Sequence, residues 1–489
     1  MIKTIQPECK ILSEALIKKI IEEAKILLER HGVFVESQTV VGLFLEKGEK
    51  VDMENQRVHI SRKIVEESLR KAPKIVKMYD RSGKKEYIVG KDVVHFNPGS
   101  AAITILDYET QKQRKPITQD LVSFVRLTEA LEHIHFQSTG LISSDVPDAM
   151  SDSYRLMICL QFSEKPIVTG TFRKEGFKPM YDMLVAVRGS EKGLAEKPLA
   201  IFDACPSPPL KWSDLTAQSL VDCARRGIPS EIISMGLTGA TSPVTLAGTL
   251  VQHVAENLSG LVICQLAKEG APVIFGGSPS SFDMRKGTTP MGAIETMMID
   301  SAYAQIGKYL HLPTHAYMGL SDSKINDSQA GLESGIGAIL AALSGINIVS
   351  GPGMMDFESC QSLEKLAIDN EICGIAYRLL RSISQREEPL AMDLYEAKEK
   401  DFHFLSMPHT KKWYREEHIF PEIIDRDAYD QWVSLGKKSM ADRASEKVKK
   451  ILKEAISNVL EKDSLKEIQK IMLSEAKNCG LDSLPEIKI

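Results

Sequence analysis

The stretch EIISMGLTGATSPVTLAGTLVQHVAENLSGLVICQLAKEGAPVIFGG, residues 231–277, contains the unit that decides the fold. It begins with a short apolar run (231–236), continues through a loop rich in glycine, serine and threonine, and enters a long apolar helix pattern before a second short run (272–277). Strands that are buried on both faces of a parallel sheet are continuous apolar runs of this kind. The stretch therefore predicts one strand–helix–strand unit of a parallel sheet.

The same unit recurs on both sides of this stretch. We expect eight strands, each followed by a loop and a helix, at residues 94–97, 133–140, 167–171, 199–204, 231–236, 272–277, 313–319 and 346–351. Eight such units are typical of a closed barrel. An open doubly wound sheet could also contain eight strands, but it would need no closing eighth unit. The pattern thus predicts an α/β fold, a (β/α)8 TIM barrel over residues 93–381.

The segments that flank the barrel differ from it in pattern. Residues 1–92 contain two helix patterns (12–32 and 62–72) on either side of a hairpin pattern at 47–60, so we expect an N-terminal cap of helices and a hairpin. Residues 382–489 are charged and amphipathic, which is typical of helices that pack on a barrel or in a subunit interface. We expect a C-terminal helical extension there and a homo-oligomeric assembly.

The composition and charge of the chain argue against several classes of protein. The chain of 489 residues has a formal net charge of -5 with both signs scattered along it, which argues against a nucleic-acid binder. It contains no apolar run long enough to span a membrane, and its first residues lack the apolar core of a signal peptide. The 8 cysteines form no C-x-x-C pair and mostly lie in apolar runs, so we expect reduced core cysteines and a cytoplasmic location.

The active site of such a barrel lies in the loops that follow the strands. Six aromatic residues fall at or just past a predicted strand end: Phe96, Phe202, Trp212, Phe282, Tyr317 and Phe357. A ring face attracts a cation, including one that has no N–H to donate. The alternative for each ring is ordinary packing in the barrel or its loops. Six rings at one rim favour a cation site.

Charged residues occur in the same loops. Six are acidic: Asp203, Asp283, Asp322, Asp327, Glu333 and Asp356. We interpret Asp327 and Asp356 as helix caps, and Asp203 and Asp322 as groups that could stabilise a bound cation. Gln329 and Glu333 are four residues apart and share one helix face. Arg285 could hold a substrate carboxylate, although an exposed loop charge explains it equally well.

The sequence lacks several familiar catalytic motifs. It has no P-loop, no G-x-G-x-x-G after a strand and no G-x-S-x-G elbow. We interpret His133 and His135 as a buried structural pair, because no third metal ligand accompanies them. We likewise expect His95 and His315 to be packed and hydrogen-bonded within strands, and we expect no metal site.

Several long stretches are similar to the trimethylamine methyltransferase superfamily, specifically to its members that lack pyrrolysine and demethylate quaternary amines. The stretches are 94–101 (VHFNPGSA), 116–134, 236–277, 318–372 (beginning MGLSDSKINDSQAGLESG) and 409–432 (HTKKWYREEHIFPEIIDRDAYDQW). The resemblance implies a barrel that transfers a methyl group from nitrogen to cobalt(I) of a small, separate corrinoid protein. The chain itself would then bind no cofactor permanently.

The resemblance also bears on the substrate. It places the family's pyrrolysine within Gly319–Lys324, where this chain has only standard residues. Trimethylamine is a poor methyl donor unless it is activated, whereas a quaternary ammonium leaves as a neutral tertiary amine. Such a substrate needs alignment and a water-poor cage rather than an acid or a nucleophile. We therefore expect a substrate like glycine betaine, proline betaine, carnitine or γ-butyrobetaine.

These considerations give a set of expected site residues, with no catalytic acid, base or nucleophile among them. We expect Asp322 and Asp203 to stabilise the cation. The expected substrate-binding residues are Phe96, Asn97, Phe202, Arg285, Tyr317, Ser321 and Phe357, and the expected corrinoid-facing residues are Gly99, Ser323, Gln329 and Glu333. Two alternatives stay open. One is the same barrel with a methylamine, methoxylated or sulfonium donor, and the other is a non-catalytic betaine-binding protein that docks the corrinoid protein.

Overall fold

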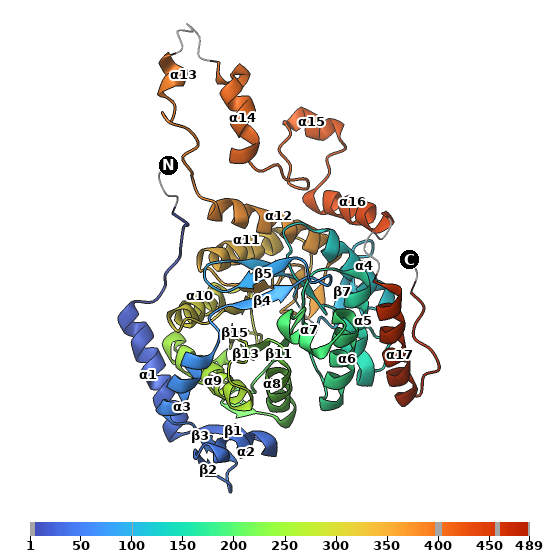
Figure 1. Ribbon diagram of the computed structural model, residues 1–489. Coiled ribbons are helices and arrows are strands. Elements are labelled where there is room, and N and C mark those ends of the chain that lie inside the picture. The colour runs from blue at the N-terminus through green and yellow to red at the C-terminus, as the bar shows by residue number, and fades with distance from the viewer. Residues whose placement is uncertain (1–4, 100, 397–402, 455–459, 488–489) are drawn as a thin grey trace.

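The chain forms a closed barrel of eight parallel strands (Figure 1). The computed structural model describes residues 5–99, 101–396, 403–454 and 460–487. The barrel strands are β6 (His95–Asn97), β9 (Gln137–Ser138), β10 (Ile167–Gly170), β11 (Ala200–Ala204), β13 (Ser230–Ser234), β15 (Val273–Gly277), β17 (His315–Tyr317) and β18 (Ile348–Ser350). All eight predicted strands are therefore confirmed, and the open-sheet alternative is wrong.

Two sheets join to close the barrel. One has the order β15-β13-β11-β10-β9 and the other the order β17-β18-β6, and all their pairings are parallel. A parallel bridge between Phe275 and Thr314 joins β15 to β17. The backbone N–H of His135 donates to the carbonyl of Phe96 at 2.8 Å and joins β9 to β6. Closure leaves no free strand edge in the barrel.

Helices surround the barrel between successive strands. They are α4 (Thr118–Ala130), α5 (Ser151–Phe162), α6 (Phe177–Arg188), α7 (Glu191–Glu196), α8 (Asp214–Arg226), α9 (Leu246–Ala267), α10 (Ile294–Tyr309), α11 (Ser328–Leu343) and α12 (Leu363–Leu380). Asp327 caps α11 by accepting from the backbone N–H of Ala330, as expected. The expectation that Asp356 caps the last barrel helix is wrong, because Ser362 caps α12.

Short strands in the loops form small sheets at the mouth of the barrel, the end at which the carboxyl ends of the strands lie. The first and last loops supply β7 (Thr104–Asp107), β8 (Lys112–Arg114), β19 (Met354–Met355) and β20 (Cys360–Gln361), in the order β19-β20-β7-β8. Two other loops supply β14 (Leu237–Thr238) and β16 (Ser280–Ser281), which pair with each other. These strands hold the loops that carry the candidate site.

The N-terminal segment forms the expected helices and hairpin, with further elements between them. It contains α1 (Glu14–Arg30), β1 (Val33–Val35), α2 (Gln38–Glu46), β2 (Lys50–Asp52), β3 (Arg57–His59), α3 (Arg62–Lys71), β4 (Val76–Tyr79) and β5 (Glu86–Val89). Strands β2 and β3 are the predicted hairpin, and β1 also pairs with β12 (Lys211–Trp212). Helices α1 and α3 pack on α9.

The hairpin β4–β5 closes the end of the barrel opposite the mouth. Met78 and Val89 on the hairpin pack in one cluster with Val168, Ile201 and Ile274, which point into the barrel. In Figure 1 the hairpin lies across the centre of the barrel. His95 is also at this end, where its ring lies 2.9 Å from the carbonyl of Ile88 in the hairpin and 3.0 Å from the ring of His135. Because the hairpin covers this end, the open end of the barrel is the mouth.

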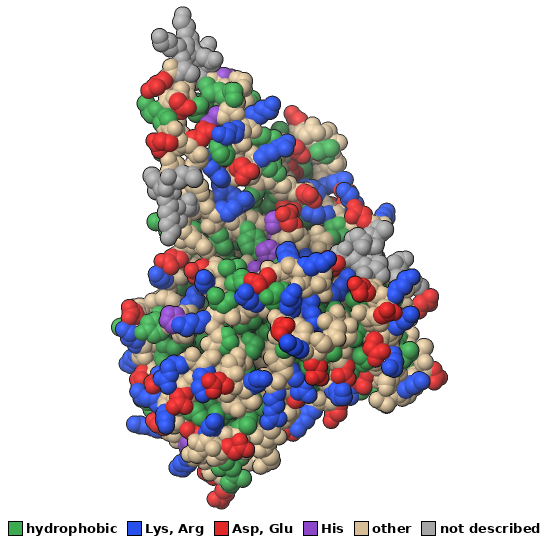
Figure 2. Space-filling model, in the orientation of Figure 1, with side chains coloured by type: hydrophobic (Ala, Val, Ile, Leu, Met, Phe, Trp, Pro, Cys, Tyr) green, Lys and Arg blue, Asp and Glu red, His purple; other side chains and the backbone are tan. Residues whose placement is uncertain are grey.

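The C-terminal segment is helical. It contains α13 (Met392–Glu396), α14 (Pro408–Glu417), α15 (Tyr429–Ser434), α16 (Met440–Lys453) and α17 (Lys462–Asn478). Helix α16 packs on α12 and α4, and α17 packs on α6 and α5, whereas α13 and α14 stand away from the barrel (Figure 1). Figure 2 shows acidic and basic side chains intermixed over the face seen in Figure 1. Within the described residues, no helix is long and apolar enough to cross a membrane.

Candidate functional site

The layer of the barrel nearer the mouth is lined by polar side chains. Successive residues of a strand point to opposite faces, so His315 and Tyr317 of β17 share one face. Contacts across the barrel show that this face is the inner one: His315 lies 3.1 Å from a carboxyl oxygen of Glu231 on β13 and 2.8 Å from the hydroxyl of Ser350 on β18. We call this polar layer the inner site.

A line of contacts connects four strands across the inner site. The Ser350 hydroxyl donates to the amide oxygen of Asn97 on β6 at 2.6 Å. Nε2 of His315 lies near both the Ser350 hydroxyl and Oε1 of Glu231. Burial lowers the pKa of His315 to about 3, so the ring is neutral at ordinary pH. His315 is thus packed and hydrogen-bonded as expected, and it spans the barrel between Glu231 and Ser350.

Two carboxyl groups meet in this layer. Asp203 of β11 and Glu231 of β13 are register partners on adjacent strands, and each carboxyl shifts the pKa of the other. Oδ1 of Asp203 and both carboxyl oxygens of Glu231 are buried and receive no hydrogen bond from the described residues. Burial raises the pKa of both, while Arg155 on α5 lowers that of Asp203 by a smaller amount. Two ionised carboxylates offer only acceptors and repel each other. The pairing is therefore favourable only when one of the two carries a proton.

A third carboxyl, that of Glu358, enters the inner site from the turn between β19 and β20. Asp356, Phe357 and Glu358 have φ angles of 49°, 56° and 66°, which is a conformation that costs free energy for non-glycine residues. This turn directs the Glu358 carboxyl to the hydroxyl of Ser278, which donates to it at 3.3 Å. Burial raises the pKa of Glu358 to about 8, and Asp322 and Asp203 add to the effect.

Several polar atoms of the inner site have no hydrogen-bond partner among the described residues. They are Nδ2 of Asn97, Oδ1 of Asp203, Oε1 and Oε2 of Glu231, Nδ1 of His315 and Oε1 of Glu358. Buried polar atoms in folded proteins are almost always hydrogen-bonded, so a cluster of exceptions indicates a place for a ligand or water. Asp203, Glu358 and the adjacent Gly170 are each partly accessible, so a small molecule can reach them.

The structure separates the expected aromatic residues into two groups. Tyr317 lies in the inner site, with its ring 4.9 Å from that of His315. Phe96 instead points outward and packs edge-on against Tyr377 of α12, and Phe202 points outward and packs against Phe177 of α6. Trp212 is also buried outside the barrel, where its indole N–H donates to Ser259. Phe96 and Phe202 alternate with the inward-facing residues of their strands, so neither belongs to the inner site.

Phe357 lies at the mouth and already holds a cation. The ammonium of Lys324 sits 4.0 Å from the centre of its ring and 3.5 Å from a carboxyl oxygen of Asp356. The Lys324 side chain is 55% exposed, so this pair lies nearer the solvent than the inner site. The Phe357 ring face is therefore occupied by a side chain of the protein itself.

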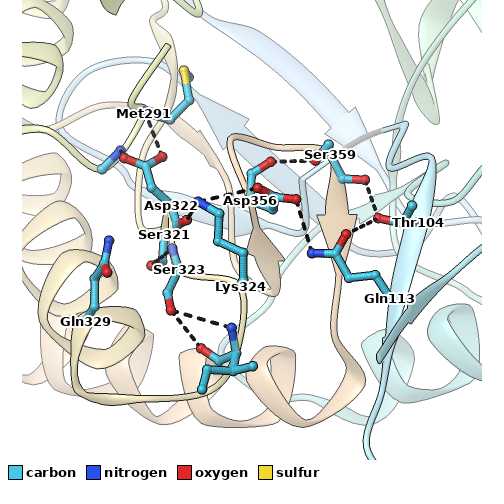
Figure 3. A network of polar contacts seen from close by, with 12 residues as sticks. Thr104, Gln113, Met291, Ser321, Asp322, Ser323, Lys324, Gln329, Asp356 and Ser359 are labelled. Carbon is cyan, nitrogen blue, oxygen red and sulfur yellow. Dashed lines mark hydrogen bonds and ion pairs between the residues drawn. The ribbon is translucent and has the colours of Figure 1, made fainter. Parts of the chain in front are cut away.

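The loop after β17 holds most of the other expected residues in a network of its own (Figure 3). The Asp322 carboxylate accepts the backbone N–H groups of Met291 and Gly292, each at 2.9 Å. The Ser321 hydroxyl donates to Glu333 at 2.6 Å, and the Gln329 amide donates to the same carboxyl at 2.9 Å. The Ser323 hydroxyl donates to Asp327 at 2.9 Å. These residues shape the loop.

The surroundings of Asp322 determine the pKa of its carboxyl group. Burial raises its pKa to about 6, against the lowering effect of the backbone hydrogen bond from Gly292. Its carboxyl also contributes to the raised pKa of Glu358, so it lies close to the inner site without lining it. Asp322 thus adds negative potential behind the site and holds the loop after β17 to the loop after β15.

Two other expected residues lie away from the inner site. Arg285 is 86% exposed in its side chain and forms two hydrogen bonds with Asp283, at 3.1 Å and 2.8 Å. Gly99 is buried beneath β19, where an added Cβ would come within 2.0 Å of Met354. An exposed, paired arginine and a buried glycine are poorly placed for the expected contacts with substrate and corrinoid.

Glu231, Glu358 and Arg155 are at the inner site although none of them was expected there from the sequence. Glu231 carries a usable signal, because a charged residue inside an apolar strand run must have a partner. Arg155 is fully buried on α5 and donates to the carbonyl oxygens of Thr139 at 2.6 Å and Ser151 at 3.3 Å. Glu358 gives no such signal, because its direction depends on an irregular turn.

The rim of the mouth carries exposed apolar side chains beside the charged Lys324 and Arg285. Each of the loops after β10, β13, β15 and β17 exposes a large apolar side chain: Phe172, Met235, Val244, Met284 and Ile325. Exposed apolar residues that gather around a site often mark a surface that binds another molecule.

Among the described residues, no group of three or more histidine, cysteine or acidic side chains is arranged to hold a metal ion.

Comparisons with known proteins agree with this architecture. The family model for trimethylamine methyltransferase (MTTB) matches residues 1–479. The trimethylamine methyltransferase MttB of Desulfitobacterium hafniense (strain DSM 10664 / DCB-2) is 31% identical over 426 residues, which are 87% of this chain and 86% of that protein. The glycine betaine methyltransferase of Desulfitobacterium hafniense (strain Y51) is 29% identical over 476 residues, 97% of this chain and 98% of that protein.

A solved structure supports the fold. The monomethylamine methyltransferase (MtmB) of Methanosarcina barkeri superposes with a TM-score of 0.52 over 97% of this chain and 89% of that chain, at 12% sequence identity. At that identity the likeness concerns the fold alone. The match of the family model over nearly the whole sequence shows more: this chain is a methyltransferase that belongs to the trimethylamine methyltransferase family.

Proposed function

We propose that this methyltransferase transfers a methyl group from a quaternary amine to cobalt(I) of a separate corrinoid protein. The observation that carries the proposal is the inner site, where three buried carboxyl groups influence one another's pKa at the end of the barrel that holds active sites. Asp203 and Glu358 are partly accessible there. Such a site favours a positively charged small molecule over a neutral or anionic one.

The arrangement suits a cation without N–H groups. Tyr317 offers an aromatic ring in the same layer, and a ring face and carboxylates attract a quaternary ammonium without hydrogen bonds. The Nδ2 group of Asn97 is a buried donor without a partner among the described residues, so it can donate to the carboxylate of a betaine. Asn97 takes the role first expected for Arg285.

The chemistry needs little beyond positioning. A quaternary amine loses its methyl group as the nitrogen becomes neutral, so no acid is required to protonate the leaving group. The residues of the inner site would hold the ammonium in one orientation and exclude water, and the acceptor would supply the nucleophile. The Gly319–Lys324 loop, which contains only standard residues, is held by the network around Asp322 and Glu333.

The exposed apolar side chains of the rim fit the second substrate, the corrinoid carried by another protein. Met235, Met284 and Ile325 surround the mouth and could contact the apolar face of a macrocycle or of its carrier. Gln329 is exposed at the start of α11 on the same end of the barrel and can make a polar contact there. Glu333 and Ser323 would act indirectly, because their hydrogen bonds hold Gln329 and the loop after β17 in place.

The test is an anaerobic methyl-transfer assay. A corrinoid protein of known activity is reduced to cobalt(I), and its visible spectrum is followed after the enzyme and one donor are added. The donors are glycine betaine, proline betaine, carnitine, γ-butyrobetaine and trimethylamine. We expect methylation of the corrinoid with one of the four betaine-like donors and none with trimethylamine.

The other outcomes separate the alternatives. Methylation by a methylamine or a sulfonium but by no quaternary amine would move the proposal to that donor class. Binding of a betaine without methylation, in the presence of a corrinoid protein shown to be active with another methyltransferase, would support a binding protein instead.

A further inference from the structure

The pairing of Asp203 and Glu231 requires a proton. Their carboxyl groups come from register partners on adjacent strands, and Oδ1 of Asp203 and both oxygens of Glu231 are buried without a hydrogen-bond donor among the described residues. A proton held by one carboxyl could be donated to the other and would supply the missing hydrogen bond. Among the described residues, no lysine or arginine nitrogen lies within ion-pair distance of either carboxyl, and the neighbour of Glu231 at 3.1 Å is the ring of His315. A pair of adjacent buried carboxyls without a counter-cation holds one proton between them at neutral pH.

The charged groups around Asp203 and Glu231 favour the state in which these two carboxyls hold one proton. The titratable groups that face the pair come from five elements: Arg155 on α5, Cys205 after β11, Tyr303 on α10, His315 on β17 and Glu358 in the turn before β20. Of these groups only Arg155 carries a positive charge, and it donates hydrogen bonds to the backbone carbonyls of Ser151 and Thr139. Glu358 contributes further negative charge when it is ionised.

We propose that Asp203 and Glu231 share one proton while no cation is bound, and that binding of a quaternary ammonium expels this proton into solvent. The proposal rests on the proposed function for the charge of the substrate. The charges balance: the pair changes from one negative charge to two, the ligand brings one positive charge, and one proton leaves. Asp203 is partly accessible, so the proton has an exit on that side of the pair.

The cation itself explains why the proton leaves. A quaternary ammonium has no N–H group, so it cannot replace the shared proton with a hydrogen bond. It can compensate the second carboxylate only by its charge, and this interaction is strong where protein atoms exclude water. A cation next to the pair therefore lowers the pKa of the protonated member and makes the doubly ionised state favourable.

The same linkage acts in reverse after methyl transfer. The product is a neutral tertiary amine, which no longer compensates the second negative charge of the pair. The pair then regains a proton from solvent, and the ion–ion attraction that held the substrate is lost. One proton is released on binding and one returns to the pair after transfer. The free tertiary amine then takes up a further proton in solution, because alkyl amines are protonated at neutral pH. The pair would thus bind the substrate more tightly than the product.

Calorimetry measures the expelled proton directly. Tetramethylammonium and glycine betaine are titrated into the full-length protein at one pH in several buffers of different ionisation enthalpy, and the slope of the observed enthalpy gives the protons released per ligand. We expect about one proton released per cation in the wild type. In Asp203→Asn the shared proton is gone, so we expect the release of about one proton fewer than in the wild type and an affinity lower by about tenfold or less. Glu358→Gln removes the other carboxyl that keeps a proton at neutral pH, and its titration shows which part of the release comes from the pair.

Controls make the result specific. Asp222→Asn removes a carboxylate that pairs with Arg226 on α8, outside the barrel, and should release the same proton as the wild type. Thermal unfolding shows whether each variant is folded. If Asp203→Asn does not fold, Glu231→Gln removes the other carboxyl of the pair and provides a second test. A wild type that binds the cation and releases no proton overturns this inference but leaves the proposed function standing. Failure of every quaternary ammonium to bind overturns both.

Discussion

Gly170 lies directly against Asp203. The two residues are register partners on β10 and β11, and a Cβ added to Gly170 would stand 3.5 Å from the Cβ of Asp203. That distance is an ordinary van der Waals contact, so the position accepts a small side chain, while anything larger extends over the Asp203 carboxyl. Both residues are partly accessible, so Gly170 keeps one side of the inner site open.

Gly170→Leu should therefore close that side of the inner site. We expect the affinity for the quaternary amine to fall more than about tenfold while the chain stays folded, because the added side chain enters accessible space rather than the packed core. Calorimetric titration measures the affinity, and thermal unfolding measures the fold. Gly42→Leu on α2, where an added Cβ meets nothing within 4 Å, is the matched control. Unchanged affinity in Gly170→Leu would place the ligand elsewhere.

The ring of Tyr317 should contribute to binding of the cation. Tyr317→Leu removes the aromatic face beside His315, and we expect affinity for tetramethylammonium to fall about tenfold, the size of a desolvated cation–π contact. Tyr317→Phe keeps the ring and should retain most of the affinity. Phe44→Leu removes a buried ring from α2, outside the barrel, and should lower thermal stability only. Equal affinities in Tyr317→Leu and the wild type would exclude the ring from the site.

The regular part of the fold could be predicted from the sequence. Most barrel strands lie in short, largely apolar runs bounded by loop residues, and this pattern follows from burial on both faces. The strands at the mouth could not be predicted in this way. Strands β19 and β20 have two residues each, and β8 is fully exposed, so none of them shows a hydrophobic period. Pairing with other loops produces these strands.

The candidate site was harder to predict, because a strand residue and its neighbour point to opposite faces. Phe202 and Asp203 are adjacent, yet Phe202 packs on α6 while Asp203 enters the barrel. In a strand buried on both faces, the apolar pattern does not indicate which residue points inward. Only the charged members could have decided it: Asp203 and Glu231 need a polar environment, and the inner site provides one.

The rim should affect the corrinoid protein and leave the small substrate unchanged. Met284→Asp places a charge on a side chain that is 61% exposed at the mouth, and we expect the KM for the corrinoid protein to rise about tenfold through lost apolar contact. Calorimetric affinity for the quaternary amine should stay at the wild-type value. Met53→Asp makes the same change at a residue that is 60% exposed in the N-terminal segment. If both variants raise the KM equally, the rim has no special role.

Glu358 should make the protein less stable as the pH rises. Burial raises its pKa from 4.5 to about 8, so between these values the folded chain keeps a proton that the unfolded chain has released. The free energy of unfolding must then decrease as the pH rises through this window. Glu358→Gln cannot ionise, so we expect its stability to fall less than that of the wild type between pH 5 and pH 8.

Urea unfolding at several pH values measures this difference. Glu196→Gln, at an exposed side chain on α7, is the control and should follow the wild-type curve. A bound quaternary ammonium should also reduce the slope, because a cation near Glu358 favours its ionised form. Parallel curves for Glu358→Gln and the wild type would mean that the carboxyl is ionised in the folded chain. Glu358 would then be a fixed negative charge in the inner site, available to the substrate at every pH in the window.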